Sequence, residues 1–569
     1  MGGIPGCCSE LEVKKLIRQG IVVLQNTGST PIYRKFTYAH LLALCGLFAF
    51  LDTFAFGITD QDEGLYSTVA RGMVQAGNFL VPRINGKPWF EKPPLLYWCS
   101  ASSMKILGFS AVAFRLPSVL AFIAILIMLV VWGNKRLGKN VGYFAGLIFA
   151  ASPLTMYLAR VGLTDMVMAC CLIAAVISMW ETARRPAWST AWGAAAGLSI
   201  LAKGPVGFGL IGAQWLLSFG LLRKQGFRAR WMIVALLVAL GVAAPWYAAI
   251  WLRYGSRFFN EFIVHQNLSR LAGGDTAHAV TQPVLYLIYY VLIIAIGLFP
   301  FSMFTPGRGE VSPANAYLRR WCWLVFGLFT LSKTKLPHYI LPMLPALALV
   351  IADSVLTRAG IPSHLEGEGI PERSRRGKGE GETAQACTCT RTAKATLRRV
   401  GVAFFGLILI VGLSALSVMW HYPLLILSAV GFAGICLPIV LRGSMPFGPD
   451  SPPFHPAALL VFLVGFHVAF CAYDAMELRP IRTLALSAPA NSPLVVYNLP
   501  HDFPSIYFYR GGDPPTVQTS DKALALGILS EGGCGFALAG REPAGDWQII
   551  ERSHTHEHKY ELFREAGHR

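Results

Sequence analysis

Charged residues are scarce in this sequence of 569 residues: Asp, Glu, Lys and Arg together make up 14%, against 54% hydrophobic residues. A soluble protein of this size carries roughly 25% charged residues. Apolar runs of about 18 to 25 residues recur along most of the chain, and each is long enough to cross a bilayer. The composition therefore excludes an ordinary soluble protein and predicts a polytopic α-helical membrane protein.

Acidic residues are fewer than basic ones, 31 against 49, which leaves a formal net charge of +18. The basic residues do not gather on a soluble domain, where they would suggest nucleic acid as a partner. They lie in short loops between apolar runs, where Lys and Arg set the orientation of a membrane protein and attract anionic headgroups. Membrane lipids are expected partners, and nucleic acid is not.

Three kinds of sequence signal are missing. No glycine-rich phosphate-binding loop is found, so a nucleotide cofactor is not expected. The 12 cysteines are scattered and have neither a disulfide nor a zinc-ribbon spacing. A cleavable signal peptide is not expected, because about 36 polar and basic residues precede the first apolar run.

The basic loops predict about thirteen transmembrane helices, with the N-terminus in the cytoplasm and the C-terminal part outside. An insert rich in Gly, Glu, Arg and Lys is expected to be disordered. The expected parts are a cytoplasmic segment at 1–36, a transmembrane catalytic domain at 37–475 with outer loops at 58–114 and 253–282 and a cytoplasmic insert at 358–398, and an extracytoplasmic soluble domain at 476–569.

The C-terminal part differs in composition from the rest of the chain. Short β-like runs alternate there with Gly and Pro, which is typical of strands separated by turns. The chain therefore predicts a small α/β domain after the last span. The β-like runs are Leu494 to Tyr497, Ser505 to Tyr509, Cys534 to Ala539 and Trp547 to Glu551.

Polar residues at the ends of the predicted spans fall on one side of the membrane. Ionisable side chains at membrane depth are costly, and they usually mark a functional site. Residues from six separate segments are expected at or just below the outer face, which predicts one site there. They are Asp60, Asp62, Glu63, Glu91, Lys92, Arg160, Asp165, Lys203, His265, Arg270, Lys333, Lys335, His338 and Tyr339.

Four ordered motifs carry a family resemblance: the acidic pair Asp62-Glu63 after the first span, the stretch Glu91 to Pro94, the stretch His265 to Arg270, and the stretch Leu331 to Pro342. Together with Arg160 to Asp165, they resemble the C-type glycosyltransferases that use lipid-phosphate sugars. These include the protein O-mannosyltransferases and, more closely, the aminoarabinose transferases that modify lipid A. The resemblance covers about the first 355 residues, and it implies the GT-C fold.

The resemblance also implies roles for particular residues. Catalytic acids and bases are expected at Asp62, which takes the general-base position, at Asp165 and at Glu63. Cations and hydroxyls for the lipid phosphate are expected at Lys92, Arg270, Tyr339 and Lys335. Ligands for a divalent metal such as zinc, with a structural role, are expected at Glu91 and His265.

Several of these assignments have a structural alternative, and Lys335 could be an orientation charge. Glu63 could be a helix-start charge favoured by the helix dipole, and Asp165 could cap the following span. Lys92 could extend to the membrane interface without a ligand. Glu91 and His265 could share a hydrogen bond in place of a metal.

The expected function is that of an inverting glycosyltransferase in the bacterial inner membrane, with its site on the periplasmic face. The donor would be a polyprenyl (undecaprenyl) phosphate sugar such as 4-amino-4-deoxy-L-arabinose, and the acceptor lipid A or another extracytoplasmic molecule. A protein O-mannosyltransferase-like enzyme is an alternative within the same superfamily. A transporter or lipid flippase is an alternative of another class, although such proteins commonly contain inverted repeats, and no repeat is found here.

Overall fold

The computed structural model describes residues 38–84, 86–138, 140–269, 283–299, 301–303, 311–358, 456–499, 503–511, 516–543, 545–555 and 558–566. The predicted cytoplasmic segment at 1–36 lies outside these residues. Almost all of the predicted insert at 358–398 lies outside them as well, together with the apolar sequence that follows it.

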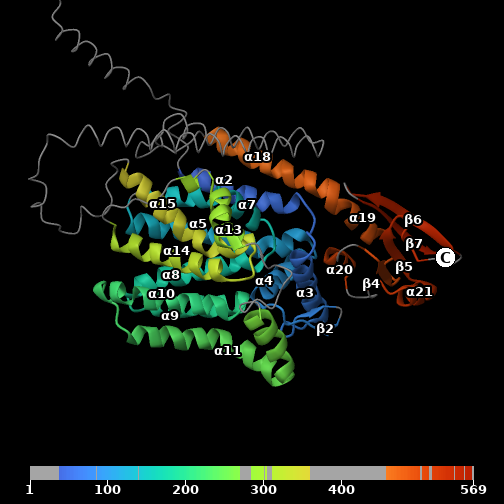
Figure 1. Ribbon diagram of the computed structural model, residues 1–569, viewed down its shortest axis with the longest axis horizontal. Coiled ribbons are helices and arrows are strands. Elements are labelled where there is room, and N and C mark those ends of the chain that lie inside the picture. Colours follow the sequence, from blue (N-terminus) through green and yellow to red (C-terminus); the bar gives the residue numbers. More distant parts are fainter. Residues whose placement is uncertain are drawn as a thin grey trace, which may run out of the picture.

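A bundle of helices makes up the larger part of the described chain, and the helices lie side by side in Figure 1. It begins with α2 (Tyr38–Leu51), η2 (Asp52–Phe54), α3 (Asp62–Ala76), the short hairpin β1 (Arg83–Ile84) and β2 (Lys87–Pro88), α4 (Leu95–Leu107), α5 (Ala111–Arg136), α6 (Val141–Ala150), α7 (Pro153–Leu158) and α8 (Thr164–Thr182). It continues with α9 (Trp188–Lys203), α10 (Pro205–Lys224), α11 (Arg230–Phe258), the π-helix η3 (Phe259–Ser269), α13 (Pro283–Gly297), η4 (Phe301–Met303), α14 (Pro313–Leu331), η5 (Pro337–Met343), α15 (Leu344–Arg358) and α18 (Pro456–Tyr473).

Six helical segments of the described chain are long and apolar enough to cross a membrane: Ala111–Arg136, Thr164–Thr182, Pro205–Lys224, Arg230–Gln266, Pro337–Thr357 and Leu459–Ser487. They establish a polytopic helical membrane protein, as the composition predicts. The number of about thirteen spans stays a prediction, because part of the apolar sequence lies outside the described residues.

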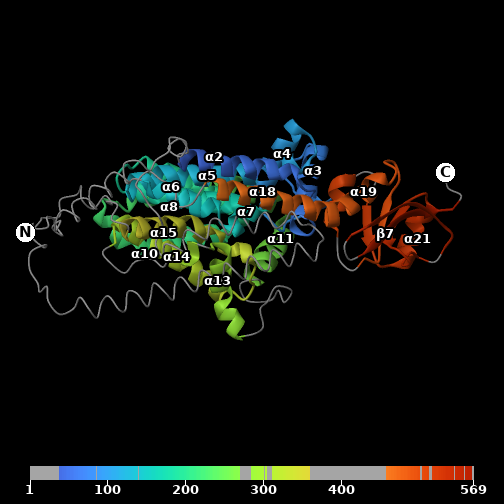
Figure 2. The same cartoon turned by 90° about the horizontal axis from the view of Figure 1, so that it is seen from above.

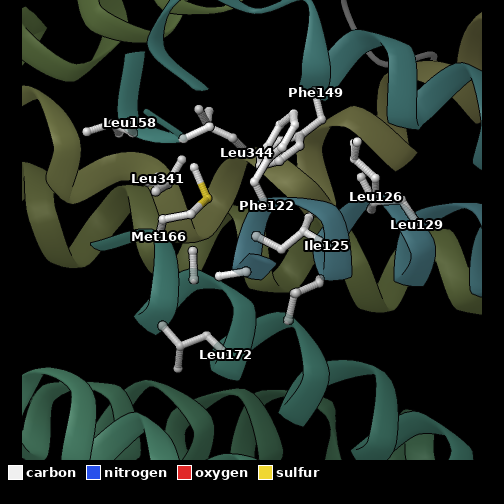
Figure 3. Packing of buried hydrophobic residues seen from close by; sticks show 14 of the residues in the cluster. Phe122, Ile125, Leu126, Leu129, Phe149, Leu158, Met166, Leu172, Leu341 and Leu344 are labelled. Carbon is white, nitrogen blue, oxygen red and sulfur yellow. The ribbon is translucent and has the colours of Figure 1, made fainter. Parts of the chain in front are cut away.

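The core of the bundle depends on close helix contacts. Leucine, isoleucine and phenylalanine side chains of α5, α6, α7, α8, η5 and α15 interlock in it (Figure 3). A Cβ atom on Gly142 of α6 would overlap the carbonyl oxygens of Leu129 and Val130 in α5. Helices in membranes approach closely where such small residues meet. Glycine is therefore required where α5 and α6 cross.

A five-stranded sheet follows the bundle, in the order β4-β3-β5-β7-β6. Strand β3 pairs in parallel with β4 and β5, whereas β7 pairs antiparallel with β5 and β6. Helices α19 and α20 cover one face, and α21 covers the other. The elements are η9 (Asp474–Leu478), α19 (Arg479–Ser487), β3 (Leu494–Tyr497), α20 (Pro504–Arg510), β4 (Thr516–Thr519), α21 (Lys522–Ser530), β5 (Cys534–Leu538), β6 (Trp547–His554) and β7 (Lys559–Glu565).

We call these elements, from Asp474 to Glu565, the C-terminal module. One strand expected from the sequence is wrong: Ser505 to Tyr509 lies in the helix α20. Pro504 occupies the first helical position, where its fixed φ and missing N–H are tolerated. A short apolar run alone does not distinguish a strand from a buried helix.

The C-terminal module lies at one end of the helical bundle, beyond the blue helices α3 and α4 (Figures 1 and 2). The orange helix α18 runs along the bundle and leads through η9 into α19. Segments from the two ends of the sequence therefore meet where α3 faces α20.

We expect Gly142→Ala to destabilise the protein by about 1–3 kcal/mol, because the added methyl group would overlap backbone atoms of α5. The measurement is the thermal unfolding midpoint in detergent. Gly212→Ala in α10 is the matched control, since its added methyl group would meet no described atom of another segment within 4 Å. A midpoint for Gly142→Ala equal to that of the control would contradict the close contact.

Candidate active site

A cavity of about 100 Å³ lies between the loop before α4 and the helices α8, α9, α10, η3, α14 and η5. Its walls are mainly apolar, with a small set of polar groups among them. The polar and charged lining residues are Glu91, Lys92, Asp165, Lys203, Gln266, Ser332, Thr334 and Tyr339. An apolar cavity with a few charged groups is the usual form of a small-ligand site, and here it suits a lipid with a charged head.

Asp165 and Lys203 form the central ion pair of this cavity. Asp165 lies in the first turn of α8 and Lys203 is the last residue of α9, where the two helix dipoles favour these charges. The Lys203 Nζ lies 2.5 Å from Asp165 Oδ1, and the His338 Nε2 lies 3.8 Å from Asp165 Oδ2. The Lys203 ammonium also lies 4.6 Å from the centre of the Tyr339 ring.

Lys92 enters the same cavity from the loop before α4, and 9% of it is exposed. Its Nζ lies 3.7 Å from Glu91 Oε1 and 5.9 Å from the centre of the Tyr66 ring. The preceding Phe90 anchors the loop by packing against the rings of Tyr254 and Phe258. A lysine held in this way is placed by its surroundings rather than extended into solvent.

Asp62 is the first residue of α3, one turn before Tyr66, and it is half-buried. Burial raises the pKa of Tyr66, and the charges of Asp62, Glu91 and Asp165 raise it further. The charges of Asp62, Lys92, Asp165 and Lys203 also all act on the His338 ring. Asp62, Lys92 and Asp165, predicted separately from the sequence, are thus brought together around one site.

The backbone immediately before Asp62 is strained. Gln61 has a φ of 62° and a ψ of −122°, a conformation with positive φ that costs free energy for a residue with a side chain. Such a conformation persists only where the surroundings fix it. Among the described residues, none makes a hydrogen bond or an ion pair with the Asp62 carboxylate. Within the described part of the chain, the carboxylate is therefore available to a substrate.

Glu63 does not share this accessibility, and the geometry does not support the catalytic role predicted for it. Its buried carboxylate is held by the Arg115 guanidinium at 2.7 Å on both oxygens, and it accepts the backbone N–H groups of Thr59 and Gly162. Burial by itself would raise the pKa of Glu63, but Arg115 and these hydrogen bonds lower it. Glu63 therefore has a structural role in the first turn of α3, which is nearer to the helix-start alternative than to catalysis.

Lys335 also differs from its prediction. Its ammonium donates hydrogen bonds to the carbonyl oxygens of Phe329 and Thr330, in the last turn of α14. A lysine often satisfies the unpaired carbonyls at the end of a helix in this way. Lys335 does not line the cavity, whereas Tyr339 does. Arg270, the remaining residue predicted for the lipid phosphate, lies outside the described residues.

The residues described do not fit the predicted metal site. Glu91 faces Lys92, and His265 is exposed with no described hydrogen-bond partner. Nowhere in the described ranges do three His, Cys, Asp or Glu side chains gather as metal ligands. Two ligands are fewer than zinc sites normally have. A metal with a structural role stays a prediction from resemblance, and no chemical step is derived from it.

Two members of the site had no role in the sequence prediction. Lys203 and His338 were expected at the same membrane face, but only the packing of α9 and η5 against α8 brings them to Asp165. One signal in the sequence could have identified Lys203: a cation at membrane depth is costly unless it is paired with an anion, so Lys203 needed a partner such as Asp165. Another member of the predicted set, Arg160, lies apart from the cavity and pairs with Asp52 in the core.

A second cavity, of about 490 Å³, lies beside the loop that leads to Asp62. Asp60, Thr59 and Gln61 form its polar edge, and aromatic residues of α7 and α18 contribute to its apolar walls. The Asp60 carboxylate accepts a hydrogen bond from the Ser505 N–H at 2.9 Å. Burial raises the pKa of Asp60 to about 6 against the opposing effect of this bond.

Comparisons with known proteins agree with the resemblance seen in the motifs. Residues 91–251 match the family described as dolichyl-phosphate-mannose-protein mannosyltransferase. The undecaprenyl phosphate-alpha-4-amino-4-deoxy-L-arabinose arabinosyl transferase 2 of Pseudomonas fluorescens is 26% identical over 355 residues, which cover 58% of this chain and 58% of that protein. The corresponding transferase of Pseudomonas aeruginosa is 25% identical over 435 residues, or 73% of this chain and 76% of that protein. The chain covers 58%, 61% and 60% of the length of three such transferases from Pseudomonas species.

Solved structures show the same fold. The crystal structure of ArnT from Cupriavidus metallidurans bound to undecaprenyl phosphate superposes with a TM-score of 0.67 at 19% identity, covering 92% of this chain and 97% of that one. Its apo state gives a TM-score of 0.66 at 18% identity, covering 96% and 98%. The resemblance predicted from the motifs is confirmed. The chain has the polytopic GT-C fold, and it is a multi-pass membrane protein.

We expect Glu63→Gln to reduce stability by roughly 3 kcal/mol, since it leaves the buried Arg115 charge without its partner. Asp62→Asn should leave stability within about 0.5 kcal/mol of wild type, because its carboxylate has no described partner. The measurement is thermal unfolding in detergent, with the yield of folded protein as a second readout. Equal stability of the two variants would contradict the assignment of a structural role to Glu63 and not to Asp62.

The pKa of Asp60 gives a prediction for pH. A carboxyl whose pKa rises from 3.8 to about 6 on folding binds more protons in the folded state between these pH values. Its contribution to stability therefore falls as the pH rises from about 4 to about 6. Asp60→Asn keeps an acceptor for Ser505 but does not titrate. The unfolding midpoint of the wild type should therefore fall relative to that of Asp60→Asn as the pH rises over this window. Midpoints of the two proteins that change in parallel with pH would contradict the raised pKa.

Proposed function

We propose that this protein is an inverting glycosyltransferase that transfers a sugar from undecaprenyl phosphate to an extracytoplasmic acceptor. The proposed sugar is 4-amino-4-deoxy-L-arabinose, and the proposed acceptor is lipid A. The names of the relatives from Pseudomonas support the donor and the sugar. The observation that carries the proposal is the convergence of Lys92 and Lys203 on one apolar cavity, with Asp62 close enough for its charge to act on the same His338 ring.

The donor would occupy the cavity bounded by α8, α9, η3 and α14. Its apolar walls suit a polyprenyl chain, and Lys92 and Lys203 would face its phosphate. Asp165 would orient Lys203 through their ion pair, so that the Lys203 ammonium has the same position before and after the donor binds. Preorganised cations at a developing negative charge are an effective means of lowering a reaction barrier.

Asp62 would act as the general base. The acceptor oxygen attacks the anomeric carbon of the sugar while Asp62 takes the proton of the acceptor hydroxyl. The bond between the anomeric carbon and the phosphate oxygen breaks, and its electron pair leaves with the polyprenyl phosphate. Attack from the side opposite the leaving phosphate inverts the anomeric centre. Lys92 and Lys203 balance the charge that develops on the phosphate.

The acceptor would approach through the second cavity. Its edge residue Gln61 directly precedes Asp62, and its apolar walls from α7 and α18 suit a lipidic acceptor. The site and the C-terminal module would then lie on the periplasmic side of the membrane. This orientation follows from the basic loops that the sequence places on the opposite side.

Two other functions are distinguishable by experiment. A protein O-mannosyltransferase-like activity draws support from the family match at residues 91–251, and it would glycosylate a peptide hydroxyl instead of lipid A. A flippase would move the lipid-linked sugar across vesicles without transferring it. Mass spectrometry of lipid A and surface glycans, with and without the protein, separates transfer to lipid A from both.

We expect Asp62→Asn and Lys92→Ala each to lower transfer of aminoarabinose to lipid A by at least about 100-fold, since they remove the base and a phosphate cation. Purified protein in detergent, lipid-linked donor and mass spectrometry of the product provide the assay. Lys105→Ala is the matched control for Lys92, because Lys105 is an exposed lysine of α4 outside both cavities. Wild-type transfer by either site variant would refute the assignment.

A further inference from the structure

The loop that carries Asp62 is held by side chains from a distant part of the chain. The Gly57 N–H donates to Asp474 Oδ1 at 2.7 Å, and the Ile58 N–H donates to the Tyr509 hydroxyl at 2.7 Å. Both acceptors belong to the C-terminal module, more than 400 positions away in sequence. The backbone just before Asp62 therefore depends on this module for two of its hydrogen bonds.

The same module touches the first turn of α3. The Asp60 carboxylate accepts the Ser505 N–H, and a Cβ atom on Gly64 would lie 2.7 Å from the Ser505 nitrogen. A Cβ atom on Gly57 would lie 2.6 Å from the Tyr509 hydroxyl. The loop and α20 are therefore in close contact on either side of Asp62, without space for a methyl group.

Helix α20 is itself fixed within the module and to the rest of α3. The Arg510 guanidinium donates to the carbonyl oxygens of Ala488, Pro489 and Ser492, in the loop after α19. The Arg71 guanidinium of α3 donates to the carbonyl oxygen of Phe508. A rigid α20 can thus determine where α3 begins.

We propose that the C-terminal module positions the base of the reaction: Tyr509, Asp474 and the Ser505 backbone hold the loop at residues 57–64 so that Asp62 faces the donor cavity. This inference rests on the proposed role of Asp62. The strained backbone at Gln61 supports it, because that conformation requires contacts that over-determine the loop. None of these three groups lines the donor cavity, so they act through Asp62 and not on the donor.

Tyr509→Phe tests the proposal, because it removes one hydroxyl and leaves the buried Ile58 N–H without its acceptor. We expect kcat to fall about 10-fold, since a small displacement of a reacting group has a large effect on rate. The KM for the lipid-linked donor and the affinity for undecaprenyl phosphate, measured with that lipid alone, should stay at wild-type values. Tyr497→Phe is the matched control, because Tyr497 packs against α21 on the opposite face of the sheet.

Wild-type kcat for Tyr509→Phe would overturn the proposal. Equal losses of kcat, lipid affinity and folded protein would overturn it as well, because they would indicate general destabilisation. Asp62→Asn is assayed in parallel. If Asp62→Asn is inactive while Tyr509→Phe is normal, the positioning role fails and the proposed function stands; if Asp62→Asn is active, the proposed function itself fails.

Discussion

The Arg115 guanidinium is completely buried where α5 meets the loop after η2 and the first turn of α3. It donates to both oxygens of Glu63 and to the carbonyl oxygens of Phe56 and Gly57. A buried charge is tolerated only when it is paired and hydrogen-bonded. This one group therefore joins three segments, and it sets the place at which α3, and hence Asp62, begins.

Similar pairs recur through the helical part of the chain. Arg160 pairs with Asp52, which also binds the His467 ring of α18 at 2.6 Å. Asp165 pairs with Lys203 in the wall of the cavity that Lys92 and Tyr339 also line. The first pair is enclosed and ties helices together, whereas the second lines a cavity and has room for a ligand. The two pairs therefore differ in their exposure to a cavity, and not in the type of charges that they join.

Asp62 directly follows Gln61, which lines the second cavity, and its charge acts on His338, which contacts Asp165 at the first cavity. The loop that places it there is held from the bundle by Arg115 and Glu63 and from the other side by the C-terminal module. Rigid support on two sides keeps the carboxylate in place while it stays available to a substrate.

The class of protein follows from composition alone, because a long apolar run has few alternatives to a helix in a bilayer. The sequence also identified the candidate site residues, since charged residues at membrane depth are rare and costly. Asp62, Lys92 and Asp165 were therefore recognisable one by one, in motifs that each occupy a few consecutive positions. How these charges are divided among roles, however, depends on the packing of the helices. Asp62 and Glu63 are neighbours in the chain, but the helix turns one toward the site and the other into the Arg115 pair.

The lysines illustrate the same limit of local information. Lys335 bonds to the end of α14, while Lys203, which the motifs left without a role, binds Asp165. Lys203 and Asp165 lie 38 positions apart, at the end of α9 and the start of α8, so they do not share a local motif. The distance between them is set by the way α9 packs against α8, and no local pattern of residues specifies that packing.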